Sequence, residues 1–262
     1  EKKNLIVIMM ESMETNFAPF TSEIDSLTKQ NLSFFPGGEA AANTDLTIAS
    51  QTAKLCGIPL NPPLREAMFG TVSGIKNFLN HAKCLTNIFA EAGYAQVYIQ
   101  GSNSEFGSKK YLWTQHGNVA VHDLNYFEKE GLFKKEDEHF WGFDDAELYR
   151  LAKKDLEKLS VDSAKPFAFY LMTVDMHIPF GYLNSSCPQK AGDEETQYPA
   201  VVACASTELA NFLKWIIREP WSKNTVIAVV GDHVHPYFNK SKDMNRFHID
   251  RKLLGSIDEE KN

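Results

Sequence analysis

The sequence predicts an α/β protein with a mostly parallel central sheet and helices on both faces. Strand-like apolar runs alternate with helix-length amphipathic segments along the chain, which is the order of a parallel sheet with crossover helices. Residues 5–10 form a continuous apolar run, as expected of a strand buried on both faces. Several runs also end in polar residues capable of chemistry, and the carboxyl ends of parallel strands share the edge at which ligands bind.

The sheet is predicted from four strong apolar runs and one weaker run. The strong runs cover residues 5–10, 94–99, 167–174 and 226–230, and the weaker run covers residues 32–35. Each strong run delivers polar residues at its end, in chain order Glu11, then Gln100, Ser102 and Asn103, then Asp175 and His177, then Asp232 and His233. We therefore expect these side chains to gather at one edge of the sheet.

Helices are predicted between the strands from capping and stop signals. They cover residues 21–28, 45–55, 85–92, 144–159 and 206–217. Gly57 and Gly93 mark two of their ends, and the acidic pair Asp144 and Asp145 suits the positive end of a helix dipole. Loops are predicted over residues 59–74 and 179–199, and only residues 252–257 of the polar tail resemble an element.

Composition and charge exclude some classes of protein. The chain has 262 residues, of which 43% are hydrophobic, enough for one large domain or two small ones. Its formal net charge is -7, and its Lys and Arg residues are scattered, so nucleic acid is not an expected partner. No stretch approaches the ~20 apolar residues of a membrane helix. Because the first strand follows Glu1 closely, we expect residues 1–262 to be a single domain excised from a longer protein.

The four cysteines leave two interpretations open. They are Cys56, Cys84, Cys187 and Cys204, and none of them forms a C-x-x-C pair, so a structural zinc site is not expected. Two sequential disulfides fit the even count and the spacing, and imply an oxidising compartment. Four unrelated buried thiols fit equally well, and three disulfide pairings are possible.

Glu11, Asp232 and His233 are candidate metal ligands. A strand that ends in Gly231-Asp232-His233 places a carboxylate beside an imidazole, and both groups bind divalent metals such as Mn²⁺ or Zn²⁺. A helix cap next to a satisfied histidine is the commoner explanation of such a pair. Glu11 favours the metal, because an ionised carboxylate at the end of a buried strand needs a positive partner.

Thr44 is the candidate nucleophile. It lies where the helix over residues 45–55 should begin, which is an N-cap position that threonine often fills. A hydroxyl coordinated to a metal can instead lose its proton and attack an electrophile, and a helix N-terminus can hold the resulting phosphate or sulfate. Thr47, at the next turn, is the fallback.

Further polar residues are candidates for binding a substrate. His177 and Asp175 follow the third strong strand, and a histidine there can orient or protonate a phosphoryl oxygen. Asn103, Lys109 and His116 follow the second strand and can donate to a phosphate. His235 is a possible further metal ligand. The aromatic residues of this half of the chain are expected in the core rather than at a ligand, and they are Phe106, Tyr111, Trp113 and Trp141.

Taken in order, these motifs resemble the extracytoplasmic catalytic domain of the phosphoglycerol transferase and lipoteichoic acid synthase family, within the alkaline phosphatase and sulfatase superfamily. The matching stretches are residues 4–12, 43–45, 56–60, 93–101, 173–179 and 231–233. Residues 56–60 and 141–145, together with the four cysteines, resemble the branch that decorates periplasmic glucans. The resemblance implies an alkaline phosphatase/sulfatase-like fold.

The resemblance also implies a mechanism. A divalent metal, usually Mn²⁺, with Zn²⁺ or Mg²⁺ as alternatives, would be held by Glu11, Thr44, Asp232 and His233. Thr44 would take the phosphoglycerol group from phosphatidylglycerol, and a hydroxyl of a glycan or polymer acceptor would then receive it. His177 matches a substrate-binding histidine of the family. An arginine that contacts the phosphate in the lipoteichoic acid branch is replaced, and Lys109 is the nearest cation.

The family further implies a location. Its members are anchored in the cytoplasmic membrane upstream of this domain and face the periplasm or the outer surface. That location favours disulfides, and we predict the pairs Cys56–Cys84 and Cys187–Cys204. The family continues beyond residues matching Asp232 and His233 through further sheet, so we expect the C-terminal part of this chain to be incomplete.

Other functions use the same residues. A phosphoethanolamine transferase has the same nucleophile and metal but another headgroup. A sulfatase is less favoured, because those enzymes place a modified Cys or Ser where Thr44 stands here. A catalytically inert binding domain with the same fold is the alternative outside enzymes.

Overall fold

The computed structural model describes residues 2–31, 33, 40–60, 77–139, 141–161, 164–189 and 197–235. Within them, one five-stranded sheet has the order β3-β2-β4-β1-β5. The strands are β1 (Asn4–Met10), β2 (Ala95–Gln100), β3 (Ala120–His122), β4 (Phe167–Met172) and β5 (Thr225–Gly231). Every neighbouring pair is parallel. The predicted fold class is confirmed.

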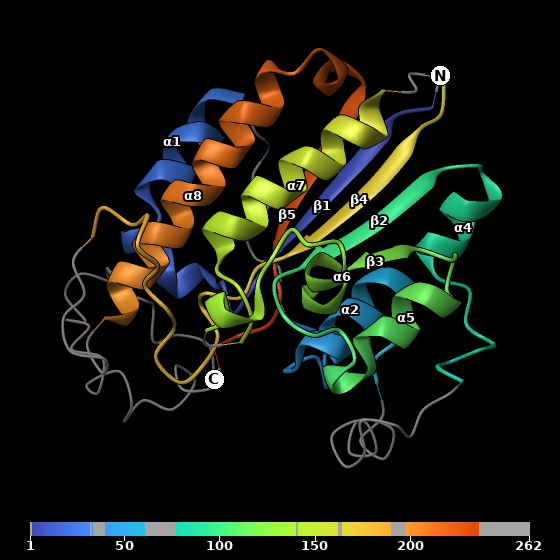
Figure 1. Ribbon diagram of the computed structural model, residues 1–262, viewed down its shortest axis with the longest axis horizontal. Helices are drawn as coiled ribbons and strands as arrows, with labels where there is room; N and C mark the ends of the chain where they lie inside the picture. The colour runs from blue at the N-terminus through green and yellow to red at the C-terminus, as the bar shows by residue number, and fades with distance from the viewer. Residues whose placement is uncertain are drawn as a thin grey trace, which may run out of the picture.

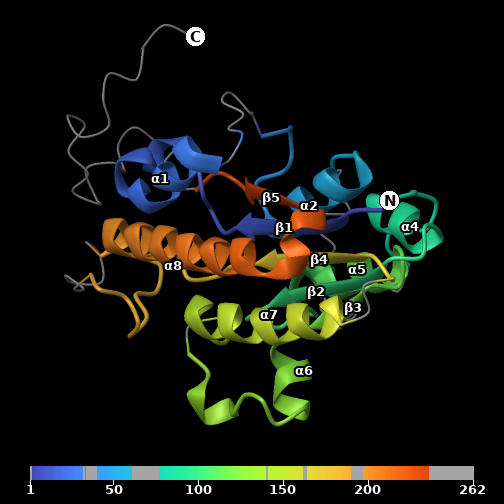
Figure 2. The same ribbon diagram turned by 90° about the horizontal axis from the view of Figure 1, so that it is seen from above.

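Helices cover both faces of the sheet, as Figure 1 and Figure 2 show. One face carries α1 (Ser22–Asn31), α6 (Leu124–Lys129), α7 (Asp145–Ser160) and α8 (Tyr198–Arg218), and the other carries α2 (Thr47–Cys56), α4 (Leu85–Glu91) and α5 (Lys109–Gln115). Short 3-10 helices lie between these elements, namely η1 (Thr15–Phe20), η2 (Phe106–Ser108), η3 (Lys135–Asp137) and η4 (Pro220–Asn224).

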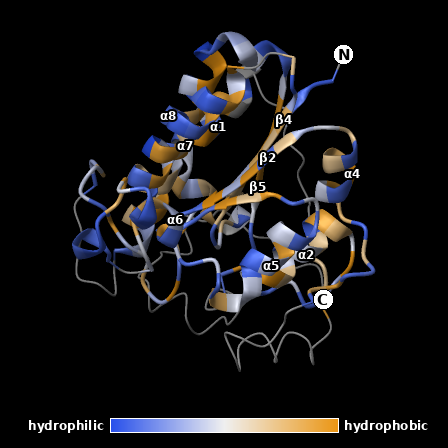
Figure 3. Ribbon diagram, turned by 45° about the vertical axis from the view of Figure 1, so that its right-hand side comes forward, coloured by the Kyte–Doolittle hydropathy of each residue, from blue (hydrophilic) through white to orange (hydrophobic). Residues whose placement is uncertain are grey.

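The alternation of side chains along each strand divides the core into two halves. Ile6 and Ile8 of β1 pack with α7 and α8, whereas Met9 packs with α2 and α5 on the opposite face. Because both faces of the inner strands are buried, those strands are mostly apolar; β4 is entirely apolar, whereas β2 buries Gln96 and Gln100. Figure 3 shows the sheet as a largely hydrophobic layer.

The strands end level with one another, which is what positions the candidate site. Met10 of β1 lies opposite Gly231 of β5, and Met172 of β4 lies opposite both Met9 of β1 and Gln100 of β2. The residues that follow these four strands therefore leave the sheet at the same edge.

The starts of two helices differ from the prediction. Helix α2 begins at Thr47 with Leu46 as its N-cap residue, so the prediction that Thr44 caps this helix is wrong. Helix α8 begins at Tyr198 rather than at residue 206. Pro199 occupies its second position, where proline's missing N–H group costs nothing, and the predicted loop is correspondingly shorter.

One strand and two α-helices were missed, besides the 3-10 helices, and three predictions cannot be compared. The missed strand is β3 and the missed α-helices are α5 and α6, each with seven residues or fewer and hence too short for a clear apolar period. The predicted strand over 32–35 (except residue 33), most of the predicted loop over 59–74 and the element over 252–257 lie outside the described residues.

Helix α8 corrects the expectation that no stretch could match a membrane helix. By length and composition, its 21 residues could cross a membrane. Its apolar face packs in the core, with Leu209, Phe212 and Leu213 almost completely buried, and it contacts α1, α7 and η1. Its hydrophobicity is accounted for by this packing.

Both predicted disulfides are present. Cys56 bonds Cys84 and Cys187 bonds Cys204, and the structure leaves no free cysteine. The first bond joins the last residue of α2 to the residue before α4. The second joins α8 to the segment that follows β4.

Candidate metal centre

Three predicted ligands meet at the edge where β1 and β5 end. Glu11 follows β1 directly, and Asp232 and His233 follow β5. One ligand atom from each of the three lies within 4.8 Å of the others. His233 Nε2 is 3.4 Å from Glu11 Oε1 and 3.6 Å from Asp232 Oδ2. Glu11 and Asp232 are buried, with 2% and 3% of their surface exposed.

The electrostatics of this set favour a bound cation. Both carboxylate oxygens of Asp232 are buried and accept no hydrogen bond from the described residues. Burial and the nearby Glu11 raise the pKa of Asp232 to about 6. Burial lowers the pKa of His233, but Glu11 and Asp232 together raise it above its usual value. Two carboxylates and one imidazole form a donor set suited to Mn²⁺, Zn²⁺ or Mg²⁺, so the residues fit the metal that the resemblance implies.

Glu11 and Asp232 are held by neighbouring strands and loops. The Glu11 backbone N–H donates to Thr173 Oγ1 over 2.8 Å, and Ser12 Oγ donates to Glu11 Oε1 over 2.7 Å. The Asp232 backbone N–H donates to the Met10 carbonyl over 2.7 Å. These bonds fix both carboxylates relative to the sheet.

Helix α2 supplies two polar side chains that the sequence analysis missed. Ser50 Oγ donates to the Asp232 carbonyl oxygen, and Lys54 Nζ donates to the same oxygen over 2.7 Å. Lys54 Nζ also lies 3.9 Å from Asp232 Oδ1. Positions 50 and 54 share a helix face because they are four residues apart, but the sequence does not indicate which element that face meets.

Thr44, the predicted nucleophile, makes no hydrogen bond to the three candidate ligands in the described part of the chain. The side chain is 6% exposed, and its hydroxyl donates to the Ala41 carbonyl over 2.6 Å. Thr44 and Asp45 line a cavity of about 290 Å³ together with Val234. Val234 is the residue after His233, which links this cavity along the chain to the candidate ligands, although Glu11, Asp232 and His233 are not among its lining residues. Thr47 is the first residue of α2.

Two further histidines are His235, two residues after His233, and His177, from the segment after β4. Burial together with His233 and His177 lowers the pKa of His235 to about 4. His177 Nδ1 lies 3.0 Å from the Ile178 carbonyl oxygen, and the His177 ring lies 4.4 Å from Trp141. His235 packs edge-on against Tyr198. His177 therefore interacts electrostatically with His235, next to the candidate ligands in the chain.

Lys109 is buried at the same edge. Its Nζ donates to the Phe106 carbonyl over 3.0 Å and lies 5.3 Å from the Phe106 ring centre. Burial lowers the pKa of Lys109 to about 8, and Glu11, Asp232 and Asp123 partly oppose that shift. Lys109 is therefore a cation within electrostatic reach of both candidate carboxylate ligands.

Three other predicted residues make local contacts instead. Asn103 Oδ1 accepts the backbone N–H of Glu105 over 2.9 Å. Asp175 Oδ2 accepts from Asn184 over 2.8 Å, in a group of buried carboxylates that does not include the candidate ligands. His116 Nε2 lies 2.8 Å from the Phe78 carbonyl oxygen in the core. The aromatic residues divide: Trp113 is fully buried, whereas Phe106 is exposed and contacts Trp141 beside His177.

This parallel sheet, with buried acids and histidines at its carboxyl edge, is typical of the alkaline phosphatase class of metal-dependent enzymes. A model of the sulfatase family matches residues 3–252, and the chain belongs to that family, within the alkaline phosphatase superfamily. The predicted resemblance is thereby confirmed.

Curated relatives and solved structures agree with this assignment. Phosphoglycerol transferase I of Escherichia coli strain K12 is 32% identical over 268 residues, which cover 95% of this chain and 34% of that protein. The chain therefore spans about a third of the length of the curated relatives it matches.

Two solved structures share the fold. A protein of the alkaline phosphatase superfamily from Vibrio parahaemolyticus has a TM-score of 0.70 and 20% identity, and the match covers 92% of this chain and 56% of that chain. The lipoteichoic acid synthase LtaP from Listeria monocytogenes has a TM-score of 0.67 and 17% identity, over 94% of this chain and 60% of that chain.

Proposed function

We propose that residues 1–262 belong to the catalytic domain of a phosphoglycerol transferase that is anchored in the membrane and faces the periplasm or the outer surface. Its donor is phosphatidylglycerol, and its acceptor is a hydroxyl of a glycan or polymer. The observation that carries this proposal is the buried set of Glu11, Asp232 and His233, and a cavity lined by Thr44 and by Val234, the residue after His233, supports it. The 32% identity to phosphoglycerol transferase I supports the choice of headgroup.

Glu11, Asp232 and His233, with Thr44 as a fourth ligand, are the residues that would hold a divalent metal, with Mn²⁺ preferred. When bound, such a metal lowers the pKa of a hydroxyl and stabilises negative charge on a phosphoryl group. Both carboxylate oxygens of Asp232 are buried and accept no hydrogen bond from the described residues. This supports the assignment of Asp232 as a metal ligand.

Thr44 acts as the nucleophile in two balanced steps. In the first, Thr44 Oγ1 loses its proton and bonds to phosphorus, the bond to the diacylglycerol oxygen breaks, and that oxygen takes up a proton. In the second, an acceptor hydroxyl loses its proton and bonds to phosphorus, the bond to Thr44 breaks, and the Thr44 oxygen is protonated again. The burial of Thr44, at 6% exposed, limits competition from water.

Lys109 and His177 bind the phosphoryl oxygens. Lys109 is buried within reach of Glu11 and Asp232, so its ammonium can neutralise a phosphate brought to those ligands. His177 reaches the same edge from the segment after β4 and can donate to a phosphoryl oxygen. Asn103 and Asp175 follow β2 and β4 and are further proposed substrate contacts; without substrate, Asn103 bonds the Glu105 N–H and Asp175 bonds Asn184.

The test is intact-protein mass spectrometry after incubation with Mn²⁺ and phosphatidylglycerol. A glycerophosphate adduct that maps to Thr44 is expected. Thr44→Ser should retain the adduct, whereas Thr44→Ala should lose it. A parallel incubation with phosphatidylethanolamine is the control for the headgroup.

Three other results would contradict parts of the proposal. An ethanolamine phosphate adduct would change the donor. An adduct on Thr47 would change the nucleophile. Failure of the full-length protein to form any adduct would refute the transfer mechanism.

A further inference from the structure

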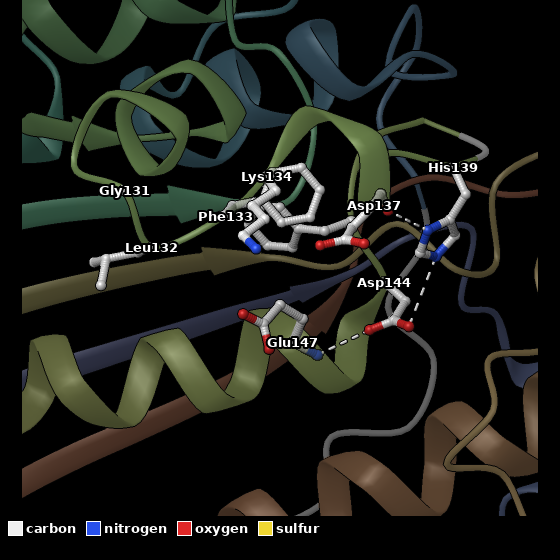
Figure 4. Close-up of a pocket in the computed structure, with 9 residues that line it drawn as sticks. Gly131, Leu132, Phe133, Lys134, Asp137, His139, Asp144 and Glu147 are labelled. Atoms are coloured by element: carbon white, nitrogen blue, oxygen red, sulfur yellow. Dashed lines mark hydrogen bonds and ion pairs between the residues drawn. The ribbon is translucent and has the colours of Figure 1, made fainter.

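A cavity of about 370 Å³ lies between the segment after α6 and the first turn of α7, where Figure 4 shows Asp137, Asp144 and Glu147. Asp144 Oδ1 accepts the Glu147 N–H over 2.9 Å, and Asp144 Oδ2 lies 3.6 Å from His139 Nε2. In the described part of the chain, no hydrogen bond or ion pair joins this lining to the candidate metal ligands. The buried polar residues of α2, in contrast, are bonded both to the sheet and to Asp232.

Gln51 of α2 is the centre of a chain of buried hydrogen bonds. Its Oε1 accepts the indole N–H of Trp113 over 3.1 Å, and its Nε2 donates to Tyr98 Oη over 3.0 Å. Tyr98 donates in turn to Gln100 Oε1 over 2.5 Å, and Gln100 Nε2 donates to the Ser102 carbonyl over 2.9 Å. Gln51, Tyr98 and Trp113 are completely buried. The chain of bonds therefore joins α2 to α5 and to the end of β2.

These bonds fix how α2 is rotated about its own axis. Ile48, Ala49 and Leu55 pack α2 into the core, but apolar contact has no preferred direction. A hydrogen bond is directional and weakens steeply when donor and acceptor turn away from each other. Two such bonds from one side chain, one to a strand and one to another helix, therefore restrict the rotation of α2 more than the apolar contacts do.

The same side of α2 meets the candidate metal centre. Positions 51 and 54 are neighbours on the helix surface, as are positions 50 and 54. Ser50 Oγ and Lys54 Nζ both donate to the Asp232 carbonyl oxygen, and Lys54 also donates to Ser50 Oγ. A rotation of α2 that breaks the bonds of Gln51 would therefore carry Lys54 away from Asp232.

The position of Lys54 matters because its ammonium lies partly inside the protein. The side chain is 31% exposed, and its Nζ lies 3.9 Å from Asp232 Oδ1. Burial lowers the pKa of Lys54, and Asp232 partly opposes that shift. A partly buried ammonium is stabilised by a carboxylate beside it. An ammonium held at this carboxylate also repels a metal cation that approaches it.

We propose that Gln51 is a positioning residue of the metal centre, which holds the Lys54 ammonium at Asp232 by fixing the rotation of α2. This inference rests on the proposed function, because only the proposed function makes Asp232 a metal ligand. Gln51 acts through Lys54. By keeping that ammonium at Asp232, it raises the concentration of metal at which the site fills.

A double-mutant cycle on the full-length protein tests whether Gln51 acts through Lys54. Gln51→Met keeps the length of the side chain and removes both of its hydrogen bonds. Alone, it should tighten Mn²⁺ binding several-fold, as Lys54→Met should, because Asp232 loses its competing ammonium. In the Lys54→Met background it should change the Kd no further. Isothermal titration measures the Kd, and a shift of equal size in both backgrounds, or none in either, would refute the proposal.

A milder variant has a matched control. Tyr98→Phe removes only the hydroxyl that accepts from Gln51, and it keeps the ring stacked on Trp113 with centroids 4.1 Å apart. It should tighten Mn²⁺ binding less than Gln51→Met does. Tyr170→Phe removes an equally buried hydroxyl that donates to Gln96 instead, so it should lower Tm by as much and leave the Kd unchanged. Equal Kd values in the two Phe variants would mean that the bonds of Gln51 serve stability alone.

Asp232→Ala separates failure of this inference from failure of the proposed function. If the unchanged protein binds Mn²⁺ no better than Asp232→Ala, the metal centre and the proposed function are wrong. Thermal unfolding without metal then decides whether Gln51 positions Lys54. Lys54→Met should lower the Tm of the unchanged protein but not that of Gln51→Met, in which the bonds from Lys54 to Asp232 are already lost. An equal fall in Tm in both would show that Gln51 does not position Lys54.

Discussion

Asp232 combines two properties that are costly in a protein without a ligand. Its carboxylate is buried, and neither oxygen accepts a hydrogen bond from the described residues. A buried carboxylate without donors is destabilised by desolvation, and Glu11 adds a second negative charge beside it. A bound divalent cation would relieve both costs. Removing one of its ligands should therefore weaken metal binding measurably.

Replacing Glu11, Asp232 or His233 by Ala should weaken Mn²⁺ binding by roughly a hundredfold or more, since even neighbours of metal ligands change affinity by about 10 to 100 fold. Isothermal titration measures the affinity, and circular dichroism should show an unchanged fold. His81→Ala, at an exposed histidine, is the control. Retention of full affinity by all three variants would show that the site is assigned wrongly.

Lys54 should oppose metal binding while stabilising the metal-free protein. Its Nζ lies 3.9 Å from Asp232 Oδ1 and donates to the Asp232 carbonyl, so it partly neutralises Asp232 and repels an incoming cation. Lys54→Met should lower the free energy of unfolding of the metal-free protein by about 1 kcal/mol, the usual net value of one hydrogen bond. It should also tighten Mn²⁺ binding several-fold.

Thermal unfolding with and without Mn²⁺ measures both effects, because a ligand stabilises in proportion to its affinity. Lys83→Met removes an exposed pair with Glu91 and should change neither quantity. A Lys54→Met protein that binds Mn²⁺ more weakly would mean that Lys54 serves chiefly to position Asp232.

At the scale of single elements, strands were predicted more accurately than helix starts. The boundaries of β1, β2 and β5 lie within one residue of the prediction, because a continuous apolar run has few alternatives. Helix starts depend on local capping, and Thr44 offered a misleading cap signal. The roles of Ser50 and Lys54 could not be predicted for another reason. They depend on which face of α2 meets the end of β5, and the sequence does not show this.

The end of β5 depends on Gly231 having no side chain. A Cβ at this position would lie 2.1 Å from the Met13 carbonyl oxygen, well inside contact distance. Gly231→Ala should therefore displace the end of β5 and lower the free energy of unfolding by about 1 to 3 kcal/mol, as for other overpacked sites. It should also weaken Mn²⁺ binding, since Asp232 follows directly.

Gly93→Ala is the comparison for this prediction. Gly93 has a φ of +81° and open space around a new Cβ, so alanine there should cost roughly 1 to 2 kcal/mol of backbone strain without affecting the metal. Denaturant unfolding and metal titration of both variants make the comparison. Equal metal affinity in both would show that the end of β5 does not control the site.

At the scale of the whole molecule, the order of the motifs was sufficient to predict the sheet class and the gathering of Glu11, Asp232 and His233. It was not sufficient for residues that reach the site through tertiary packing. Lys109 and His177 lie at the same edge, yet Asp175, only two residues from His177, is directed into a separate group of acids. The spacing of residues along the sequence does not show in which direction each side chain points once the strand has ended.

That group of acids should make the stability of the whole protein fall with rising pH. Burial and mutual repulsion raise the pKa of Asp145 and Asp175, and burial raises that of Glu208. The charged neighbours recorded for Asp145, Asp175 and Glu208 in the described residues are carboxylates. The folded protein therefore holds protons that the unfolded chain releases near the ordinary carboxyl pKa of about 4. The stabilisation is complete below that pH and is lost as the pH rises through the elevated pKa values.

Glu208→Gln should reduce this loss. The amide keeps an oxygen for the bonds from Asn184 and Ser186, and the change removes a carboxylate whose charge raises the pKa of both Asp145 and Asp175. The variant should therefore become more stable than the unchanged protein as the pH rises from 4 toward neutrality, with little difference below pH 4. Urea unfolding at a series of pH values measures this, and Glu157→Gln, at an exposed position on the neighbouring helix α7, should follow the unchanged protein. A constant difference in the free energy of unfolding between Glu208→Gln and the unchanged protein at all pH values would contradict this prediction. It would mean that the pKa of Glu208 is not raised on folding and that a cation balances the charge of Asp145, Asp175 and Glu208.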